Sequence, residues 1–229
     1  MVGARPAPRN TVHHGALPEV RSVPGAMSRE AFAHASSVSR ETLERLDVYV
    51  ALLTKWQRRI NLVSNASLAD VWRRHVLDSA QIIDYLPAAP GRVLDFGSGA
   101  GFPGLVLAIL GTDGVELVES DGRKSTFLAE AARLTGTSVT IHNVRIEALP
   151  PTPADVITAR ACATLVELLT YGERFWAPHS RFIALKGAHV DEELTDATKC
   201  WRMSIDRHPS RTDPNGTVLC LGNLERLPT

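Results

Sequence analysis

The sequence has little cysteine. Its 229 residues include three cysteines, Cys162, Cys200 and Cys220, which are widely spaced and form no C-x-x-C pair. A disulfide scaffold needs a dense, even set of cysteines and a zinc site needs closely spaced pairs, so both are disfavoured. The eight histidines also lack H-x-x-x-H and H-E-x-x-H spacing. We therefore expect reduced thiols, a cytoplasmic protein and no bound metal.

An excess of charge of either sign is also lacking. Lys and Arg number 25, as do Asp and Glu, which gives a formal net charge of zero. This excludes a polybasic coat protein, and any nucleic-acid contact must come from a local basic face. The longest strongly apolar run, near 105–110, is far shorter than the roughly 20 residues of a membrane span. The first thirty residues do not resemble a secretory signal.

The composition is typical of a soluble folded protein, with 44% apolar and 22% charged residues. Residues 1–38 show neither strand nor helix periodicity, and we expect a disordered arm without function or one that touches RNA through its arginines. Met27 is an alternative start to Met1. Residues 39–89 predict a helical cap, with one helix capped by Ser39 and a second running from Ser67 to Pro87. Val71, Leu77, Ala80 and Ile83 form the apolar stripe of the second helix.

Residues 90–229 predict an α/β domain, because short β-branched runs alternate with helical stretches. The expected strands are 92–96, 115–119, 138–142, 155–158 and 181–186, and the expected helices are 103–110, 123–134, 165–175 and 191–200. Segments 203–211 and 217–221 flank a turn cluster at 213–216, which predicts a hairpin. We therefore expect a Rossmann-like, mostly parallel sheet that finishes with antiparallel strands.

A glycine-rich loop at 97–104 lies between the first strand and the first helix of this domain, where glycines allow a ligand close to the backbone. From Gly99 it reads G-x-G-x-x-G, with Glu119 twenty positions on, as in dinucleotide sites. From Asp95 it reads D-x-G-x-G-x-G, similar to the cofactor loop of S-adenosylmethionine-dependent methyltransferases. Gly97 and Ser98 widen the turn, which favours the methyl donor over a dinucleotide. In both cases Glu119 is expected to accept hydrogen bonds from ribose hydroxyls.

Several further motifs resemble one family, the bacterial 16S ribosomal RNA guanine-N7 methyltransferases of the RsmG (GidB) type. They are W-Q-R-R-I-N-L at 56–62, R-H-V-L-D-S at 74–79, L-D-F-G-S-G-A-G-F-P-G at 94–104, V-E-S at 118–120, T-A-R-A at 158–161 and A-L-K-G at 184–187. The resemblance covers about residues 45–222. Its R-H-x-x-D-S, A-R-A and L-K-G blocks are more specific than the glycine loop.

The resemblance implies an enzyme that methylates N7 of a guanine in 16S ribosomal RNA or the small ribosomal subunit, with S-adenosyl-L-methionine as cofactor. We also expect a monomer and no contact with a membrane. The cofactor contacts that we expect are Asp95, Gly97, Gly99, Phe102, Glu119, Ile146, Glu147 and Arg160. Arg160 and Lys186 are the expected catalytic residues. RNA contacts are expected from Arg58, Arg59, Arg74, His75, Arg123, Lys124 and Lys186.

Two of these groups allow a second interpretation. Arg74, His75, Asp78 and Ser79 either form a hydrogen-bonded connection between the cap and the sheet or contact RNA directly. Cys162 is expected to be a buried free thiol rather than a nucleophile for carbon methylation, because no second cysteine accompanies it.

Two alternative functions remain open at this point. A nicotinamide-dependent oxidoreductase would use the same loop for NAD. A non-catalytic ribosome-assembly factor would bind RNA and leave the methyl group untransferred.

Overall fold

The computed structural model describes residues 25–228. The expectations for residues 1–24, including a start at Met1, lie outside the described residues. The prediction of an arm without regular structure up to residue 38 is wrong for its last part, because α1 (Arg29–Ser36) is a helix capped by Ser28. This helix is held by tertiary contacts. Phe32 is fully buried against Trp72, and the Arg29 side chain pairs with Asp47.

The rest of the cap follows as α2 (Arg40–Gln57), α3 (Asn65–Leu68), the π-helix η1 (Trp72–Leu77), α4 (Asp78–Ala80) and the 3₁₀ helix η2 (Gln81–Tyr85). Ser39 caps α2 as predicted, by accepting a hydrogen bond from the Thr42 amide. The second predicted helix is instead broken into four short pieces, and its first cap is Ser64 rather than Ser67. Because the π-turn changes the helical phase, Ile82 is buried and Ile83 is exposed.

The sheet has seven strands in the order β3-β2-β1-β4-β5-β7-β6. Its parallel strands are β1 (Val93–Phe96), β2 (Val115–Val118), β3 (Thr140–His142), β4 (Val156–Arg160) and β5 (Arg181–Lys186). The hairpin β6 (Trp201–Pro209) and β7 (Thr217–Arg226) pairs antiparallel with β5. The predicted strands and the terminal hairpin are therefore confirmed, with boundaries shifted by a few residues.

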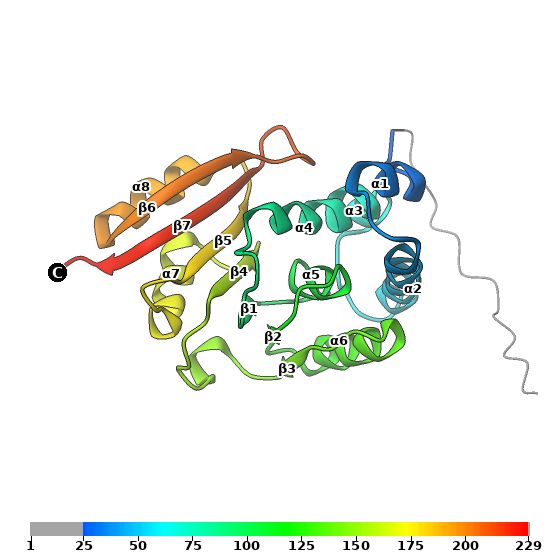
Figure 1. The fold of residues 1–229 in the computed structure, drawn as a ribbon, viewed down its shortest axis with the longest axis horizontal. Helices are drawn as coiled ribbons and strands as arrows, with labels where there is room; N and C mark the ends of the chain where they lie inside the picture. Colours follow the sequence, from blue (N-terminus) through cyan, green and yellow to red (C-terminus); the bar gives the residue numbers. More distant parts are fainter. Residues whose placement is uncertain (1–24, 229) are drawn as a thin grey trace, which may run out of the picture.

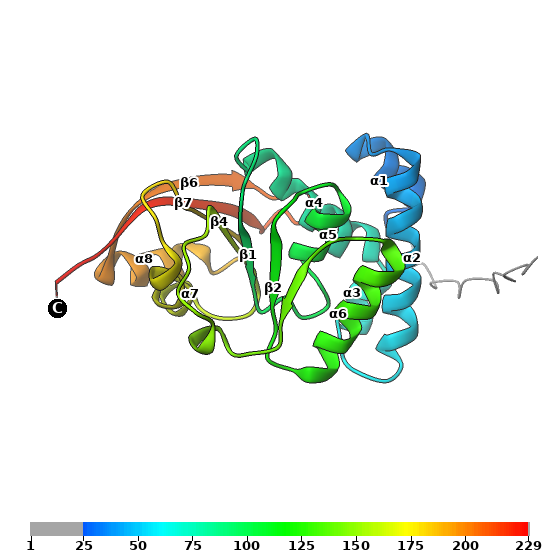
Figure 2. The same cartoon turned by 60° about the horizontal axis from the view of Figure 1, so that its bottom comes forward.

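Helices cover both faces of this sheet. On one face lie α5 (Gly104–Ile109) and α6 (Gly122–Thr135), and α2 of the cap packs outside them within the same core (Figure 1). On the other face lie α7 (Leu165–Gly172) and α8 (Val190–Cys200), which form a second core with β4 and β5 (Figure 2). Two short 3₁₀ helices, η3 (Ile146–Ala148) and η4 (Glu173–Phe175), complete the domain. The carboxyl ends of β1, β2, β4 and β5 thus share one edge beside the cap.

Candidate active site

The glycine loop after β1 makes a tight turn that only small residues allow. Gly97 has φ of 60° and Gly99 has φ of 56°, both in the left-handed region. A Cβ atom on Gly97 would lie 2.6 Å from the Cβ atom of Cys162, which follows β4. Glycine at 97 is therefore required twice, by its own backbone and by the close approach of the Cys162 loop.

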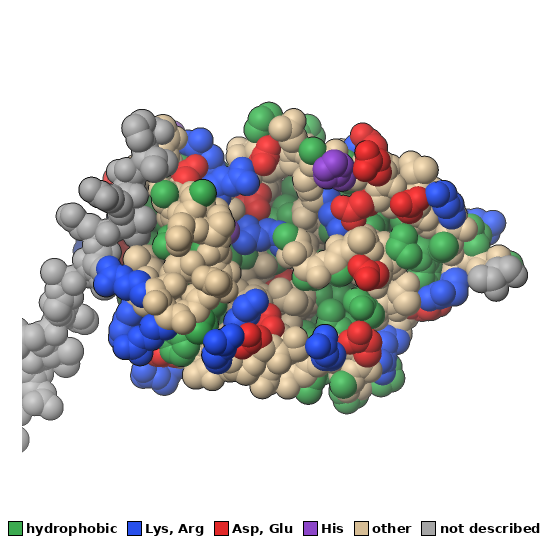
Figure 3. All heavy atoms as spheres, turned by 180° about the vertical axis from the view of Figure 1, so that it is seen from behind, with side chains coloured by type: hydrophobic (Ala, Val, Ile, Leu, Met, Phe, Trp, Pro, Cys, Tyr) green, Lys and Arg blue, Asp and Glu red, His purple; other side chains and the backbone are tan. Residues whose placement is uncertain are grey.

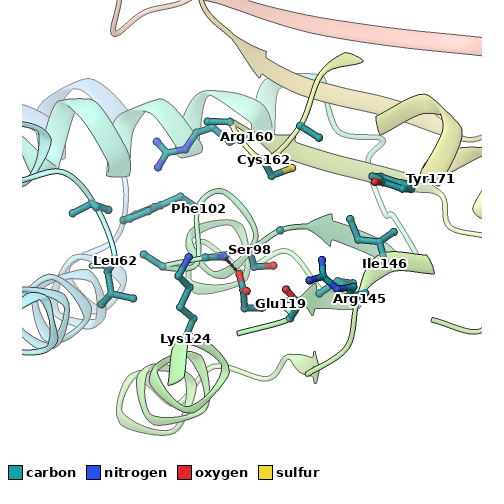
Figure 4. Close-up of a pocket in the computed structure, with 18 of the residues that line it drawn as sticks. Leu62, Ser98, Phe102, Glu119, Lys124, Arg145, Ile146, Arg160, Cys162 and Tyr171 are labelled. Carbon is teal, nitrogen blue, oxygen red and sulfur yellow. Dashed lines mark hydrogen bonds between the residues drawn. The ribbon is translucent and has the colours of Figure 1, made fainter. Parts of the chain in front are cut away.

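Glu119 follows β2 and fixes the floor of the loop. Its carboxylate accepts hydrogen bonds from the Gly99 and Asp121 amides, each at 2.8 Å (Figure 4). The residue is 7% exposed. A carboxylate oxygen has two lone pairs, so each oxygen retains capacity for a further donor.

Asp95 differs from the prediction of a cofactor contact. Its side chain is fully buried beneath the loop and does not line the cavity. One carboxylate oxygen accepts a 2.7 Å hydrogen bond from Thr158, whereas the other has no partner. Burial raises the pKa of Asp95 to about 6, although the hydrogen bond from Thr158 opposes this. Asp95 shapes the loop from behind.

A cavity of about 570 Å³ opens over the loop, within the size range of ligand sites. Seven of the eight predicted cofactor residues line it, namely Gly97, Gly99, Phe102, Glu119, Ile146, Glu147 and Arg160. Ile146 and Tyr171 lie at one end, and Arg160 and Phe102 lie at the other (Figure 4). The cavity is therefore elongated across the ends of β1 and β2.

Arg160, at the end of β4, connects the sheet to the cap. Its guanidinium donates to the Arg74 carbonyl, to Asp78 Oδ2 and to His75 Nδ1 at 2.7 Å. It also lies 4.8 Å from the centre of the Phe102 ring, which stacks on His75. The predicted connection between cap and sheet is present through His75, Asp78 and the Arg74 carbonyl. The prediction is wrong for Ser79, whose buried hydroxyl has no hydrogen-bond partner.

His75 is neutral at this junction. Burial and the adjacent Arg160 charge lower its pKa to about 3. Because Arg160 donates to Nδ1, the ring proton is placed on Nε2.

Lys186, predicted to be catalytic and to contact RNA, is buried at the end of β5. Its ammonium donates to Glu193 at 2.7 Å and to the Ala163 carbonyl at 3.1 Å, and its side chain is 5% exposed. Glu193 also accepts from the Leu165 amide at the start of α7. In this arrangement Lys186 holds the loop between β4 and α7 and uses two of its three N–H groups within the protein.

Cys162 is exposed at the cavity wall, so the expectation of a buried residue is wrong. Desolvation of the sulfur by the surrounding protein, together with the Asp95 carboxylate, nevertheless raises the pKa of the Cys162 thiol to about 11. The expectation that Cys162 does not attack a base stays a prediction.

The remaining predicted RNA contacts separate into two groups. Lys124 and His75 line the cavity, and Arg74 and Lys186 line a neighbouring one. Arg58, Arg59 and Arg123 are exposed and line neither. The face in Figure 3 is hollowed near its middle, and Lys and Arg side chains gather over the end that carries the first helices.

Sequence reasoning missed Tyr171, Glu193 and the hairpin turn residues Thr212 and Asp213. Tyr171 and Glu193 lie on helices with no local motif, where an aromatic or acidic residue has no distinctive spacing. Thr212 and Asp213 belong to a turn that predicted a hairpin and nothing else. Glu193 could have been suggested only by asking which acid pairs with the lysine of L-K-G.

Neither a membrane-spanning helix nor a cluster of metal-ligating side chains is found within residues 25–228. The expectation of no metal stays a prediction.

Solved structures with the same fold include a methyltransferase described as S-adenosylmethionine-dependent from Aquifex aeolicus. It has a TM-score of 0.52 at 17% identity, over 68% of this chain and 95% of that one. The E81Q mutant of MtNAS in complex with S-adenosylmethionine has a TM-score of 0.54 at 16% identity, over 87% and 85% of the two chains. With the sheet order and the terminal hairpin, these likenesses define the fold as that of the class I S-adenosylmethionine-dependent methyltransferases.

The family follows from closer relatives. A family model described as rRNA small subunit methyltransferase G (GidB) matches residues 42–212. The ribosomal RNA small subunit methyltransferase G of Rhodospirillum rubrum is 55% identical over 200 residues, which cover 87% of this chain and 100% of that protein. That of Paramagnetospirillum magneticum is 50% identical over 200 residues, 87% of this chain and 98% of that protein. The chain belongs to the rRNA small subunit methyltransferase G family.

Proposed function

We propose that this protein transfers the methyl group of S-adenosyl-L-methionine to N7 of a guanine in 16S ribosomal RNA. The observation that carries the proposal is the elongated cavity over the glycine loop, with a carboxylate at its floor and an arginine–aromatic pair at one end. The family membership supports the methyl-transfer class and the ribosomal substrate.

The residues present fit the cofactor. Gly97 and Gly99 leave open backbone where a side chain at Gly97 would collide with Cys162. Glu119 offers the lone pairs that two ribose hydroxyls need. The Ile146 side chain and the Tyr171 ring supply apolar surface for an adenine ring at the end away from Arg160 (Figure 4).

S-adenosylmethionine supplies a methyl group on a positively charged sulfur. Guanine N7 carries a lone pair and no proton, so the N–C bond can form as the S–C bond breaks without a general base. The protein's contribution is orientation, with the two reacting atoms about 3 to 3.5 Å apart, and charge stabilisation as the purine becomes cationic. Glu119 on the floor of the cavity and the Arg160–His75–Phe102 group at one end are the residues that would orient the two substrates.

The RNA is proposed to approach over the cap and the start of α6. Arg58, Arg59, Arg123 and Lys124 supply exposed or half-exposed cations there. Because such contacts release counterions, RNA affinity should fall steeply between low and moderate salt. We further propose that the protein acts as a monomer in the cytoplasm.

Methyl transfer can be tested directly. Wild-type protein is mixed with labelled S-adenosylmethionine and small ribosomal subunits from cells that lack the gene, and N7-methylguanine is then mapped in the RNA. The proposal expects label at one guanine. Subunit binding without transfer would instead favour the assembly-factor alternative, and thermal stabilisation by NAD but not by S-adenosylhomocysteine would favour the oxidoreductase.

A further inference from the structure

We infer that a second cavity, next to the first, receives the target guanosine after it has left the RNA stack. This inference rests on the proposed function and assigns the place of its substrate. The cavity has a volume of about 350 Å³. It is lined by five separate segments, namely Ser64 and Ser67, Arg74 to Asp78, the end of β4, the end of β5, and the hairpin turn from Ser210 to Thr217.

The position of the cavity fits a methyl acceptor. Ser64, His75, Arg160 and Ala161 line both cavities, so the second cavity adjoins the first at these residues. Both cavities lie at the carboxyl edge of the parallel strands, where ligands of open α/β sheets bind. A base in the second cavity therefore faces the Arg160 end of the first, opposite to the proposed adenine end.

The π-helical turn of the cap and the residue that follows it form one side of the second cavity. Arg74, His75 and Asp78 all line the second cavity, because their spacing along the turn places them on one face. π-turns are rare and are frequently found at functional sites. Here the turn directs His75 toward Phe102 and Asp78 toward Arg160, and leaves Arg74 toward the hairpin.

The charges around the cavity single out Arg74 as the contact for an RNA phosphate. Three ion pairs surround the cavity, and two are largely buried, Arg160–Asp78 and Lys186–Glu193. The third, Arg74–Asp213 at 3.0 Å, has side chains that are 47% and 34% exposed and joins the cap to the hairpin turn. An exposed pair contributes little to stability, so a phosphate can displace Asp213 from Arg74 at small cost.

The hydrogen-bonding groups suit a base that enters from a single strand. Enzymes that modify a base commonly extrude it and contact its edges with polar groups. Ser67, Asp213 and Thr217 contribute such groups to this cavity, together with backbone at Gly187. Asp213 is the carboxylate that becomes free when Arg74 turns to a phosphate, and it can then accept the N–H groups of guanine.

Gly187 offers a way to fill the cavity without disturbing the fold. A Cβ atom at this glycine meets no atom within 4 Å, and its backbone is not in the left-handed region. In Gly187→Phe we expect wild-type affinity for S-adenosylhomocysteine and a fall of about 100-fold in methyl transfer to small subunits, because the base is displaced from the donor. Gly187→Ala should lie between this variant and wild type.

Adjacent arginines provide a matched pair of variants. Arg73 donates to the Gly25 carbonyl and lines neither cavity, whereas Arg74 lines the second. Arg74→Ala should raise the KM for the subunit and lower the slope of log affinity against log salt by about 1. Arg73→Ala should leave both close to wild type.

These experiments distinguish the proposed guanosine site from the proposed methyl-transfer activity. If wild-type protein transfers no methyl group, the proposed function fails and this inference fails with it. If wild-type protein transfers and Gly187→Phe does so at an equal rate, or Arg74→Ala matches Arg73→Ala, the guanosine binds elsewhere and only this inference is overturned. Loss of transfer in Gly187→Phe with S-adenosylhomocysteine binding retained supports it.

Discussion

The two neighbouring cavities of this enzyme are built in different ways. The floor of the first comes from one continuous loop, Gly97 to Phe102, and from Glu119 at the next strand end. The second is assembled from five segments that span residues 64 to 217. A local glycine turn therefore defines the floor of the first cavity, whereas the second cavity depends on how the cap docks onto the sheet. The variants below separate these local and long-range contributions.

The junction at Arg160 should give the largest effect. In Arg160→Gln the guanidinium contacts to Arg74, His75 and Asp78 are lost, and the half-buried Asp78 carboxylate loses its cation. Breaking such a pair costs about 3 to 5 kcal/mol of unfolding free energy, measured by urea denaturation. Arg160→Lys keeps the positive charge but lacks the planar set of guanidinium donors, so it should lower the unfolding free energy by less than Arg160→Gln does. A loss below about 1 kcal/mol in Arg160→Gln would mean that the cap docks without this junction.

Asp95 beneath the glycine loop and His75 in the cap should change the unfolding free energy in opposite directions as pH rises. Between pH 3.8 and about 6 the native Asp95 keeps a proton that the unfolded chain has lost, so its contribution to stability falls as pH rises. Over this pH range the Asp95 carboxyl lowers the unfolding free energy by about 3 kcal/mol. Native His75 is neutral down to about pH 3, whereas the unfolded side chain is charged below pH 6.5. Its contribution therefore rises with pH over about 3 to 6.5.

Urea unfolding of wild type, Asp95→Asn and His75→Asn across pH 4 to 7 checks these signs. Asp95→Asn should remove the part of the unfolding free energy that decreases as pH rises. His75→Asn should remove the part that increases as pH rises. An unchanged pH slope in Asp95→Asn would show that this carboxyl is not held protonated by the fold.

At the glycine loop, substitution should distinguish backbone strain from collision. Gly97→Ala combines a left-handed backbone with a 2.6 Å approach to Cys162 and should cost about 2 kcal/mol in the ligand-free protein. Gly99→Ala has a similar φ, but its nearest neighbour is 3.7 Å away, so only the backbone cost of about 1 kcal/mol applies. Adding Cys162→Gly to Gly97→Ala should recover the difference. No recovery would place the strain elsewhere in the loop.

The smallest effect is expected at the start of the cap. Ser39→Ala removes the side-chain acceptor of the Thr42 amide and should cost about 1 kcal/mol. Ser39→Asp should retain the stability, because aspartate also caps helices. Equal stability of the alanine variant and wild type would show that α2 is held by packing alone.

Much of the fold was predictable from local patterns. The strand β5 was expected over the same residues that the structure gives, and the helix starting after Ser39 was correct at its cap. Helix α1 was missed because its short, weakly apolar segment gains stability mainly by burying Phe32 against Trp72. The broken second cap helix was missed because a π-turn has no periodic signature that a sequence reveals.

The site shows the same division. The sequence predicted contacts to one cofactor from Gly97, Phe102, Glu119 and Ile146, because each lies near a strand end. In the structure all four line one cavity. The placement of Asp95 was wrong because strand alternation turns its side chain beneath the loop. Lys186 was expected to be free for RNA, but its partner Glu193 lies on a helix whose docking the sequence does not specify.

The sequence by itself determined the alternation of strands and helices, the glycine turn and the family, because backbone propensities and short motifs act over a few residues. The tertiary structure decided which charges are paired, which thiol is exposed and where the second cavity lies. Those properties depend on distances between residues far apart in the chain, and only the packing of the cap and the hairpin against the sheet sets them.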